Sequence, residues 1–497
     1  MAVTAYPVIL IDSTDTNASD SNASGAGPST AITGTNASTS ADGLTVTLDG
    51  SPNLASVATD GSHVIYLEDT ATGNRRFAAI NGVDNVAKTV TVEQSYAASL
   101  TGKSWAIGGV RATLFGSSSG LLIEQFVSQT GGDAQAGWTM EMQSGHSETT
   151  AQQYDIGRNN SQGNTTAGDI TIRGVRGVSD ANIPTVNFSA SSPTWGFIRV
   201  LGDYFKFEDF KITASNVGGY AGAAIAIDSN NHTNNSIRGM IIGDPDSSHT
   251  GFGVGLSLYV GSLAFYPIVE NCCLQNNVDG IRTNNYRGIY VRNCIIRNNS
   301  GYGIYFNFTG ADLGSHVIDG CLIVDNGGHG IVEDAVSATR SVHGGTKHIT
   351  KCTISNNGGD GIRIPSNSTS IAWGGRKICD CIITGNSGYA INCTGTIVAD
   401  QLNAEPPFLS NNIIYNNTSG GVTPTAVSDL LVNTSLINPQ FADESSGDYR
   451  PSSVAAGLAI SATRRGISVS SDDSVGALAS VSSGGGGAGT YHPLYLN

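Results

Sequence analysis

Polar and aromatic side chains recur at one position in consecutive repeats of the second half of the chain. Each stands directly before a Gly-Ile or Ala-Ile pair: Tyr302, His329, Asp360 and Tyr389, with Arg363 three residues beyond Asp360. Aromatic faces beside a carboxylate and a guanidinium suit a glycan, which presents apolar C–H faces together with hydroxyl groups. These five residues are therefore glycan-facing candidates. The favoured alternative is a solvated loop rim, because exposed side chains are common at such rims.

Carboxylates that could act in acid–base chemistry are few in this region. Lyases of acidic polysaccharides need clustered carboxylates for Ca²⁺ and a basic residue, and glycoside hydrolysis needs a carboxylate pair. The weak candidates are the adjacent Glu333 and Asp334, together with Asp360. We therefore favour a chain without catalytic residues, metal or cofactor. The enzymatic alternative is a polysaccharide lyase or a glycoside hydrolase.

Two tripeptides imitate motifs of polygalacturonase-type hydrolases. Gly328-His329-Gly330 matches a GHG motif, and Ile362-Arg363-Ile364 matches part of an RIK motif. Both fall on repeat positions that hold unrelated residues in other copies, and short motifs match freely by chance. The paired-Asp motif of those enzymes is not found in the sequence. Coincidence within a repeat is the favoured interpretation.

The elements that must position these side chains form a repeat, and repeats dictate the fold. Six segments align at intervals of 22 to 31 residues: NCCLQNN, NCIIRNN, GCLIVDN, KCTISNN, DCIITGN and NNIIYNN, starting at Asn271, Asn293, Gly320, Lys351, Asp380 and Asn411. Alternation along a strand puts the second and fourth residues of each segment on one face. Both positions hold small or aliphatic residues in nearly every copy. We expect that face to point into a core.

Cysteine fills the second position in five of the six segments. These anchor residues are Cys272, Cys294, Cys321, Cys352 and Cys381, with Asn412 in the sixth copy. Cysteine is a small and readily buried side chain, so we predict a column of free thiols packed in the core. Metal binding is the alternative, but no consistent CxxC pair or neighbouring His accompanies the column.

An asparagine stands five residues after every anchor. The column is Asn277, Asn299, Asn326, Asn357, Asn386 and Asn417. Asparagine tolerates the left-handed conformation and bonds neighbouring backbone, and stacked amides bond one another along an axis. We predict a structural ladder in which each asparagine makes the tight turn of its coil.

Each repeat thus consists of a strand, an asparagine turn, a second strand and a variable loop. This order predicts an all-β chain dominated by a right-handed parallel β-helix, because only stacking buries the apolar side of each coil. Alternating runs upstream predict a small antiparallel β domain. The expected divisions are 1–111 for that domain, 112–167 for a cap leading into the β-helix, 168–465 for the β-helix, and 466–497 for a Gly-rich linker and C-terminal peptide. Within the cap, LLIEQFV (121–127) would form one short helix over the first coil. That peptide would dock on a partner or remain a disordered end.

Charge and hydropathy exclude some classes of partner. The net charge is −15, with 25 Lys and Arg in 497 residues, so we expect no nucleic-acid surface. No apolar run approaches membrane-spanning length. The N-terminus lacks the basic region of a signal peptide, so synthesis in a cytoplasm without export is the simpler expectation.

We expect the segment NPQFADESSGDYRPSS (438–453) to close the last coil. That segment and the asparagine column resemble the pectate-lyase-like parallel β-helix proteins, a fold that serves enzymes, adhesins and viral spikes alike. The segments ASGAGPSTAITGTNAST and GWTMEM are similar in texture to β-helix proteins of tailed bacteriophages. That resemblance implies a structural virion component, a decoration protein or tailspike, with residues 1–111 as its attachment domain. It implies a place on the virion surface and other capsid or tail proteins as partners. Host glycan and a second copy of the chain stay open as partners, and a glycan-degrading tailspike as the alternative function.

Overall fold

The computed structural model describes the chain between residues 8 and 451. Within that range it leaves out 15–31, 60–62, 68–76, 93–94, 97–98, 109, 115–136, 152, 158–168, 176–181, 190–195, 215–219, 230–233, 244–250, 261–266, 284–287, 309–315, 336–346, 365–376, 394–407, 424–430, 433, 437, 440 and 447. The expected cap helix at 121–127, the Gly-rich linker and the C-terminal peptide lie outside the described residues.

The chain divides into two compact units, which are described separately. The first comprises Met1–Ala190, Phe197–Thr213 and Asn234–Ser236. The second comprises Ser191–Gly196, Ala214–Thr233 and Ile237–Asn497.

The first unit contains a closed barrel with the strand order β2-β3-β6-β5-β4-β7. Its strands are β2 (Ile32–Thr39), β3 (Thr45–Thr47), β4 (Val64–Leu67), β5 (Phe77–Asp84), β6 (Thr89–Val92) and β7 (Lys103–Gly108). Their pairings are antiparallel. Ile65, Ile80, Val90 and Trp105 are among the buried residues of its core. The prediction of a small antiparallel β domain near the N-terminus is confirmed.

The first unit also contains the first coils of parallel sheet. The strands are β1 (Val8–Ile11), β8 (Val110–Arg111), β9 (Thr139–Met142), β10 (Ser147–Thr150), β11 (Tyr154–Ile156), β12 (Ile170–Gly174), β13 (Thr185–Phe188), β14 (Gly196–Val200), β15 (Phe205–Glu208) and β16 (Lys211–Ala214). Strand β1 pairs in parallel with both β8 and β9. Parallel coils therefore begin well before residue 168, and the segment 8–11 belongs to them rather than to the barrel.

Burial explains why β1 joins the coils. Ile9 pairs with Met140 and Ile11 with Met142, and all four side chains are fully buried. The segment is a short apolar run without an asparagine turn, so the repeat pattern alone could not assign it.

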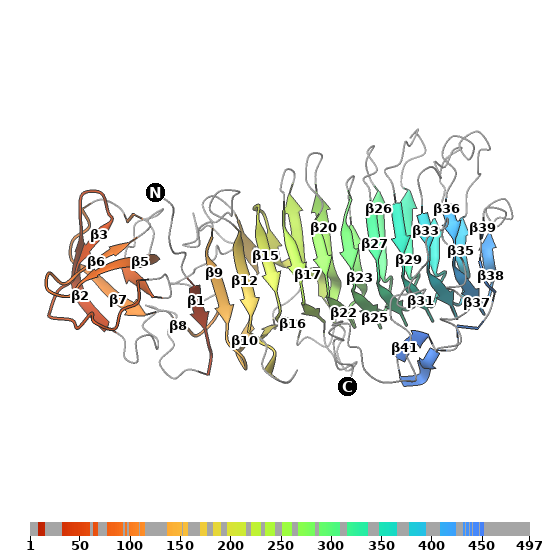
Figure 1. Cartoon of the computed structure of the whole chain (residues 1–497), viewed down its shortest axis with the longest axis horizontal. Coiled ribbons are helices and arrows are strands. Elements are labelled where there is room, and N and C mark those ends of the chain that lie inside the picture. The colour runs from red at the N-terminus through yellow and green to blue at the C-terminus, as the bar shows by residue number, and fades with distance from the viewer. Residues whose placement is uncertain are drawn as a thin grey trace, which may run out of the picture. The chain divides into compact units, whose positions relative to one another are not determined.

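The second unit is built from three parallel sheets, and each coil adds one strand to each sheet (Figure 1). The first sheet holds β18 (Ser236–Arg238), β21 (Ile268–Glu270), β24 (Tyr290–Arg292), β27 (His316–Asp319), β30 (Lys347–Thr350), β33 (Lys377–Cys379), β36 (Phe408–Ser410) and β39 (Leu431–Val432). The second sheet holds β19 (Ile241–Ile242), β22 (Cys273–Gln275), β25 (Ile295–Arg297), β28 (Leu322–Val324), β31 (Thr353–Ser355), β34 (Ile382–Thr384) and β37 (Ile413–Tyr415). The third sheet holds β17 (Tyr220–Ser229), β20 (Phe252–Val260), β23 (Asp279–Thr283), β26 (Ile304–Phe308), β29 (Ile331–Ala335), β32 (Ile362–Ile364), β35 (Tyr389–Cys393) and β38 (Gly420–Thr423). The predicted parallel β-helix is confirmed.

The coil turns at two corners, one on each side of the second-sheet strand. The residue before each anchor has a positive φ, at Asn271, Asn293, Gly320, Lys351, Asp380 and Asn411. The second corner has a positive φ at Asn276, Asn298, Asp325, Asn356, Gly385 and Asn416. These residues directly precede the ladder asparagines, so the prediction that the ladder residue itself is left-handed is wrong. Left-handed backbone and side-chain bonding are divided between two adjacent residues.

The ladder asparagines bond from coil to coil inside the helix. From Asn299 onward, each Nδ2 donates to the Oδ1 of the next asparagine at 2.8–2.9 Å. The backbone N–H of the same residue donates to that oxygen at 3.1–3.2 Å. Nδ2 also donates to a strand carbonyl of the preceding coil, as from Asn357 to Ile323 at 3.2 Å. Asn357 and Asn386 are fully buried, so these bonds satisfy polar groups that water cannot reach.

The anchor cysteines lie in the core as predicted. All eight cysteines of the chain are free and buried. The anchor thiols donate to main-chain carbonyls, as Cys294 Sγ does to Arg292 O at 3.2 Å and Cys352 Sγ to Thr350 O at 3.2 Å. Burial raises the pKa of the Cys294 and Cys352 thiols.

Burial and a raised pKa predict slow thiol chemistry, because the thiolate is the reactive form. In the native protein at pH 8, we expect an aromatic disulfide reagent to modify the cysteines at least about a thousand times more slowly than in denaturant, because less than about one in a thousand molecules of a stable fold is unfolded. The unfolded chain should release eight equivalents. Rapid labelling of Cys294 or Cys352 before unfolding would contradict their placement in the core.

Candidate functional site

Four residues at or just before the start of third-sheet strands form one column, here called the slot column: Tyr302, His329, Asp360 and Tyr389. Main-chain bonds hold their coils together, since Gly303 N donates to His329 O at 3.0 Å and Gly330 N to Asp360 O at 3.0 Å. Glycine follows each of the first three residues, and a Cβ on Gly330 would lie 2.7 Å from Gly361 O. The tight stacking at these glycines sets the spacing of the column.

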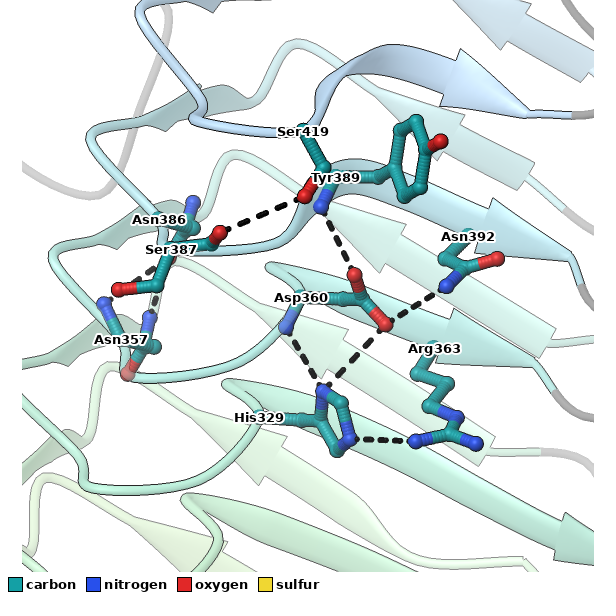
Figure 2. A network of polar contacts seen from close by, with 9 residues as sticks. All are labelled: His329, Asn357, Asp360, Arg363, Asn386, Ser387, Tyr389, Asn392 and Ser419. Atoms are coloured by element: carbon teal, nitrogen blue, oxygen red, sulfur yellow. Dashed lines mark hydrogen bonds and ion pairs between the residues drawn. The ribbon is translucent and has the colours of Figure 1, made fainter.

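Asp360 is the centre of a polar network on this flank (Figure 2). Its Oδ1 accepts from Tyr389 N at 2.8 Å, and its Oδ2 accepts from Asn392 Nδ2 at 2.9 Å. Its own N–H donates to His329 Nδ1 at 2.7 Å. Asp360 is 5% exposed, so the expectation that it sits on an open edge is wrong. Both carboxylate oxygens bind the next coil, and this is a structural role.

Asp279 has the same structural role in an earlier coil. Its Oδ1 accepts from Tyr302 N at 2.8 Å, and Oδ2 pairs with the Arg282 guanidinium. The carboxylate is buried, at 2% exposure. Asp279 is absent from the predicted site residues, although it stands directly before Gly280-Ile281 as the slot residues do. Alignment on the glycine rather than on the cysteine anchor would have found it.

His329 is held neutral by its surroundings. Its Nδ1 accepts from Asp360 N, and its Nε2 lies 2.9 Å from Arg363 Nη1. Because Nδ1 accepts, the one proton of the neutral ring is on Nε2, and a second proton on Nδ1 would break the bond from Asp360 N and add a positive charge beside Arg363. Burial lowers the pKa of His329, the Asp360 carboxylate raises it in part, and Arg363 lowers it further. The ring is therefore an acceptor near neutral pH and is not an imidazolium partner for Asp360.

The lowered pKa of His329 predicts a pH-dependent stability. The unfolded histidine takes up a proton at a higher pH than the folded one, so its contribution is complete above the unfolded pKa and is lost as pH falls through the folded pKa. We expect the Tm to decrease between pH 7.5 and 5.5, and less steeply in His329→Gln, which keeps an acceptor but does not titrate. His348, whose pKa is also lowered by burial, serves as the comparison: His348→Gln should remove a separate part of the slope. Identical pH profiles for wild type and His329→Gln would contradict the assignment.

Aromatic rings cover the part of the flank that water reaches. Tyr302 stacks on His329 with ring centroids 5.6 Å apart, and it packs against Tyr305 at 5.3 Å. The Arg282 guanidinium lies 5.4 Å from the centre of the Tyr305 ring. These side chains are half-buried, as are Arg363 and Tyr389. The structure thus brings the five glycan-facing candidates together on one flank.

The acidic pair does not contribute to this flank as a pair. Glu333 pairs in register with Phe306, and both side chains are buried, so Glu333 lies on the core side of β29. The Asp334 side chain is outside the described residues. Among the described residues, no cluster of three or more His, Cys, Asp or Glu side chains could hold a metal ion. Across the same residues, no helix has the length and apolar character needed to cross a membrane.

Part of the coil region matches a known protein family. Residues 174–343 match the family model described as right handed beta helix region. The coil region is a right-handed parallel β-helix. A search of curated proteins gives no match.

Solved structures similar to this β-helix differ in origin and role. They include ORF18 of Geobacillus virus E2, with 13% identity, a TM-score of 0.39, and alignment over 63% of this chain and 54% of that protein. The pectate lyase Pel9A has 15% identity and a TM-score of 0.38, over 70% of this chain and 80% of the enzyme. Tailspike protein 3 of bacteriophage CBA120 has 9% identity and a TM-score of 0.30, over 60% of this chain and 54% of the tailspike. This chain therefore spans about half the length of each phage protein.

Proposed function

We propose that this chain is a non-catalytic structural protein of a bacteriophage particle, in which the β-helix is a rigid element. One observation supports the absence of catalysis: the carboxylates of Asp360 and Asp279 are already occupied by bonds within the β-helix. Asp360 accepts through both oxygens, and Asp279 through one oxygen while its other pairs with Arg282. A general acid or base must be free to exchange a proton with substrate, and these two carboxylates are committed to holding coils together.

Rigidity follows from the bonds that link successive coils. The asparagine ladder and the main-chain sheets run along the same axis, and between His329 and Tyr389 the bonds of the slot column add a third link between coils. A solenoid of this kind suits a spacer or a spike.

The place in a virion rests on the sequence resemblance to tailed-phage proteins and on the presence of a separate barrel. A compact barrel offers one distinct docking face, whereas stacked coils repeat the same surface. We therefore assign particle attachment to the barrel strands β2–β7, with capsid or tail proteins as partners and the virion surface as location.

The test is to image the protein in its native particle. Virions purified from a culture that produces this protein are labelled with an antibody against the full chain and viewed by electron microscopy. Regular labelling of capsid or tail supports the proposal, and absence from purified virions overturns it. Incubation of the purified protein with acidic and neutral bacterial polysaccharides should release no unsaturated or reducing ends. Release of either kind of end by the wild-type protein would overturn the non-catalytic assignment.

A second candidate function, glycan binding without cleavage, is favoured by the half-exposed aromatic flank. Tyr302, Tyr305 and Arg282 present ring faces and a guanidinium together, which suits sugar C–H faces and hydroxyls. Retention on immobilised host polysaccharide should weaken severalfold in Tyr305→Ala, roughly 1 kcal/mol for one stacked ring. Tyr415→Ala is the matched control, because Tyr415 is 37% exposed on the second sheet, away from this flank. Equal retention of both variants and wild type would exclude the flank as a glycan site.

A further inference from the structure

The outer face of the second sheet is apolar where polar residues would be expected. Its strands read LIV at β28, IIT at β34 and IIY at β37. The middle residue of each points into the core, so the flanking Leu322, Val324, Ile382 and Ile413 lie on the outer face. All four are nevertheless buried, at 3% exposure or less. A segment of the same chain covers them.

The covering segment is a hairpin formed by β40 (Phe441–Asp443), the 3₁₀ turn η2 (Glu444–Ser446) and β41 (Asp448–Pro451) (Figure 1). Tyr449 packs with Leu322 and Val324, and Phe441 adds to the same cluster. Phe441 also packs with Ile382 and Ile413. The sequence pattern predicts that this segment closes the last coil. It lies instead on the outer face of the second sheet, where Phe441 and Tyr449 pack against apolar residues.

Polar bonds fix the hairpin at one coil corner. The Tyr449 hydroxyl lies 2.9 Å and 3.1 Å from the two oxygens of Asp325, and Asn356 Nδ2 lies 3.2 Å from the same hydroxyl. Asp325 and Asn356 are the left-handed corner residues of successive coils. Burial raises the pKa of Tyr449 and so does the nearby Asp325 carboxylate, which keeps the hydroxyl protonated as a donor. Ser355 adds a longer bond to Glu444 at 3.5 Å.

We propose that the hairpin β40–β41 is a lengthwise brace that makes four consecutive coils open as one unit. In a solenoid each coil contacts only its neighbours, so coils near an end can open one at a time. The hairpin contacts residues on β28, β31, β34 and β37 at once. Opening the coil of β37 alone would then expose Phe441 and its partners, which adds a cost that neighbour contacts do not carry.

The test is hydrogen exchange by mass spectrometry on the full chain, with Tyr449→Phe and Phe441→Ala compared to wild type. Tyr449→Phe removes the hydroxyl bonds and keeps the ring, so it leaves the fold intact even if Phe441→Ala does not. We expect amide exchange in β28, β31, β34 and β37 to accelerate together, by about tenfold for the loss of one bond to a charged acceptor. Exchange in β9 and β12 should not change.

Tyr415→Phe is the control, because it removes a tyrosine hydroxyl from the same sheet where the ring is partly exposed. It should leave exchange unaltered. Acceleration confined to residues 441–451, or to β37 alone, would show that the hairpin is a passive cover, and would overturn the brace. Neither outcome bears on the virion proposal, which is tested by imaging.

Discussion

Replacing Asn357 by alanine should lower the free energy of unfolding by about 3–5 kcal/mol, since it orphans two or more buried polar groups at about 1–3 kcal/mol each. The side chain makes two bonds as donor, to Ile323 O and Asn386 Oδ1, and its oxygen accepts from both nitrogens of Asn326. Without it, the Asn326 N–H and the Ile323 carbonyl are left in a region that water does not reach. The measurement is the midpoint of equilibrium unfolding in guanidinium chloride.

Asn187→Ala is the matched control for the ladder. Asn187 also links neighbouring strands, accepting from Thr213 Oγ1 at 3.1 Å and donating to Thr149 Oγ1 at 3.4 Å. It is half-buried at the surface, so water replaces its bonds and the cost should stay below about 1 kcal/mol. If both variants unfold at the same denaturant concentration, the ladder is not the source of stability that its geometry indicates.

Replacing Gly330 by alanine should cost about 3 kcal/mol, at the upper end of the usual range for overpacking a core. The added methyl group would lie 2.7 Å from Gly361 O and 2.7 Å from Ile354 Cγ2. Main-chain oxygen cannot move aside without separating two coils, so the slot column and the ladder would both be strained. Thermal unfolding followed by circular dichroism should show a clearly lowered Tm.

Gly421→Ala is the control, because Gly421 occupies the same position in its repeat as Gly330. A Cβ there would meet only Ile414 Cγ2 at 3.5 Å, an ordinary contact, so Gly421→Ala should change stability by less than about 0.5 kcal/mol. Ala390, which is fully buried, already occupies this column near its end. A Gly330→Ala protein as stable as Gly421→Ala would show that the coils relax more easily than their spacing indicates.

The periodic features of the fold could be predicted from the sequence because each depends on a residue and its own coil. Alternation along a strand sets which side chains point inward, and stacking repeats that choice at every coil. The cysteine anchors and the asparagine ladder are such features, and both lie in the core where the pattern indicates. The left-handed residue of this corner was predicted one position too late, at the ladder asparagine, since the pattern alone does not separate Asn356 from Asn357.

The candidate site was predicted less completely. The sequence places Tyr302, His329, Asp360 and Tyr389 in one column, but it does not show which of them face water. Asp360 is buried because its carboxylate caps the coil that follows, and the partner atoms, Tyr389 N and Asn392 Nδ2, come from that coil. Whether a carboxylate is free for chemistry therefore depends on contacts between repeats.

The repeat, the inward columns and the parallel β-helix follow from the sequence alone, because they depend on side-chain size and period. The pairing of β1 with β9 and the position of the hairpin β40–β41 instead depend on tertiary structure. Tyr449 binds Asp325 across 124 residues of sequence, and Ile11 pairs with Met142. Neither segment carries the repeat. Their positions are fixed by apolar surface that exists only after the coils have stacked, so no local pattern encodes them.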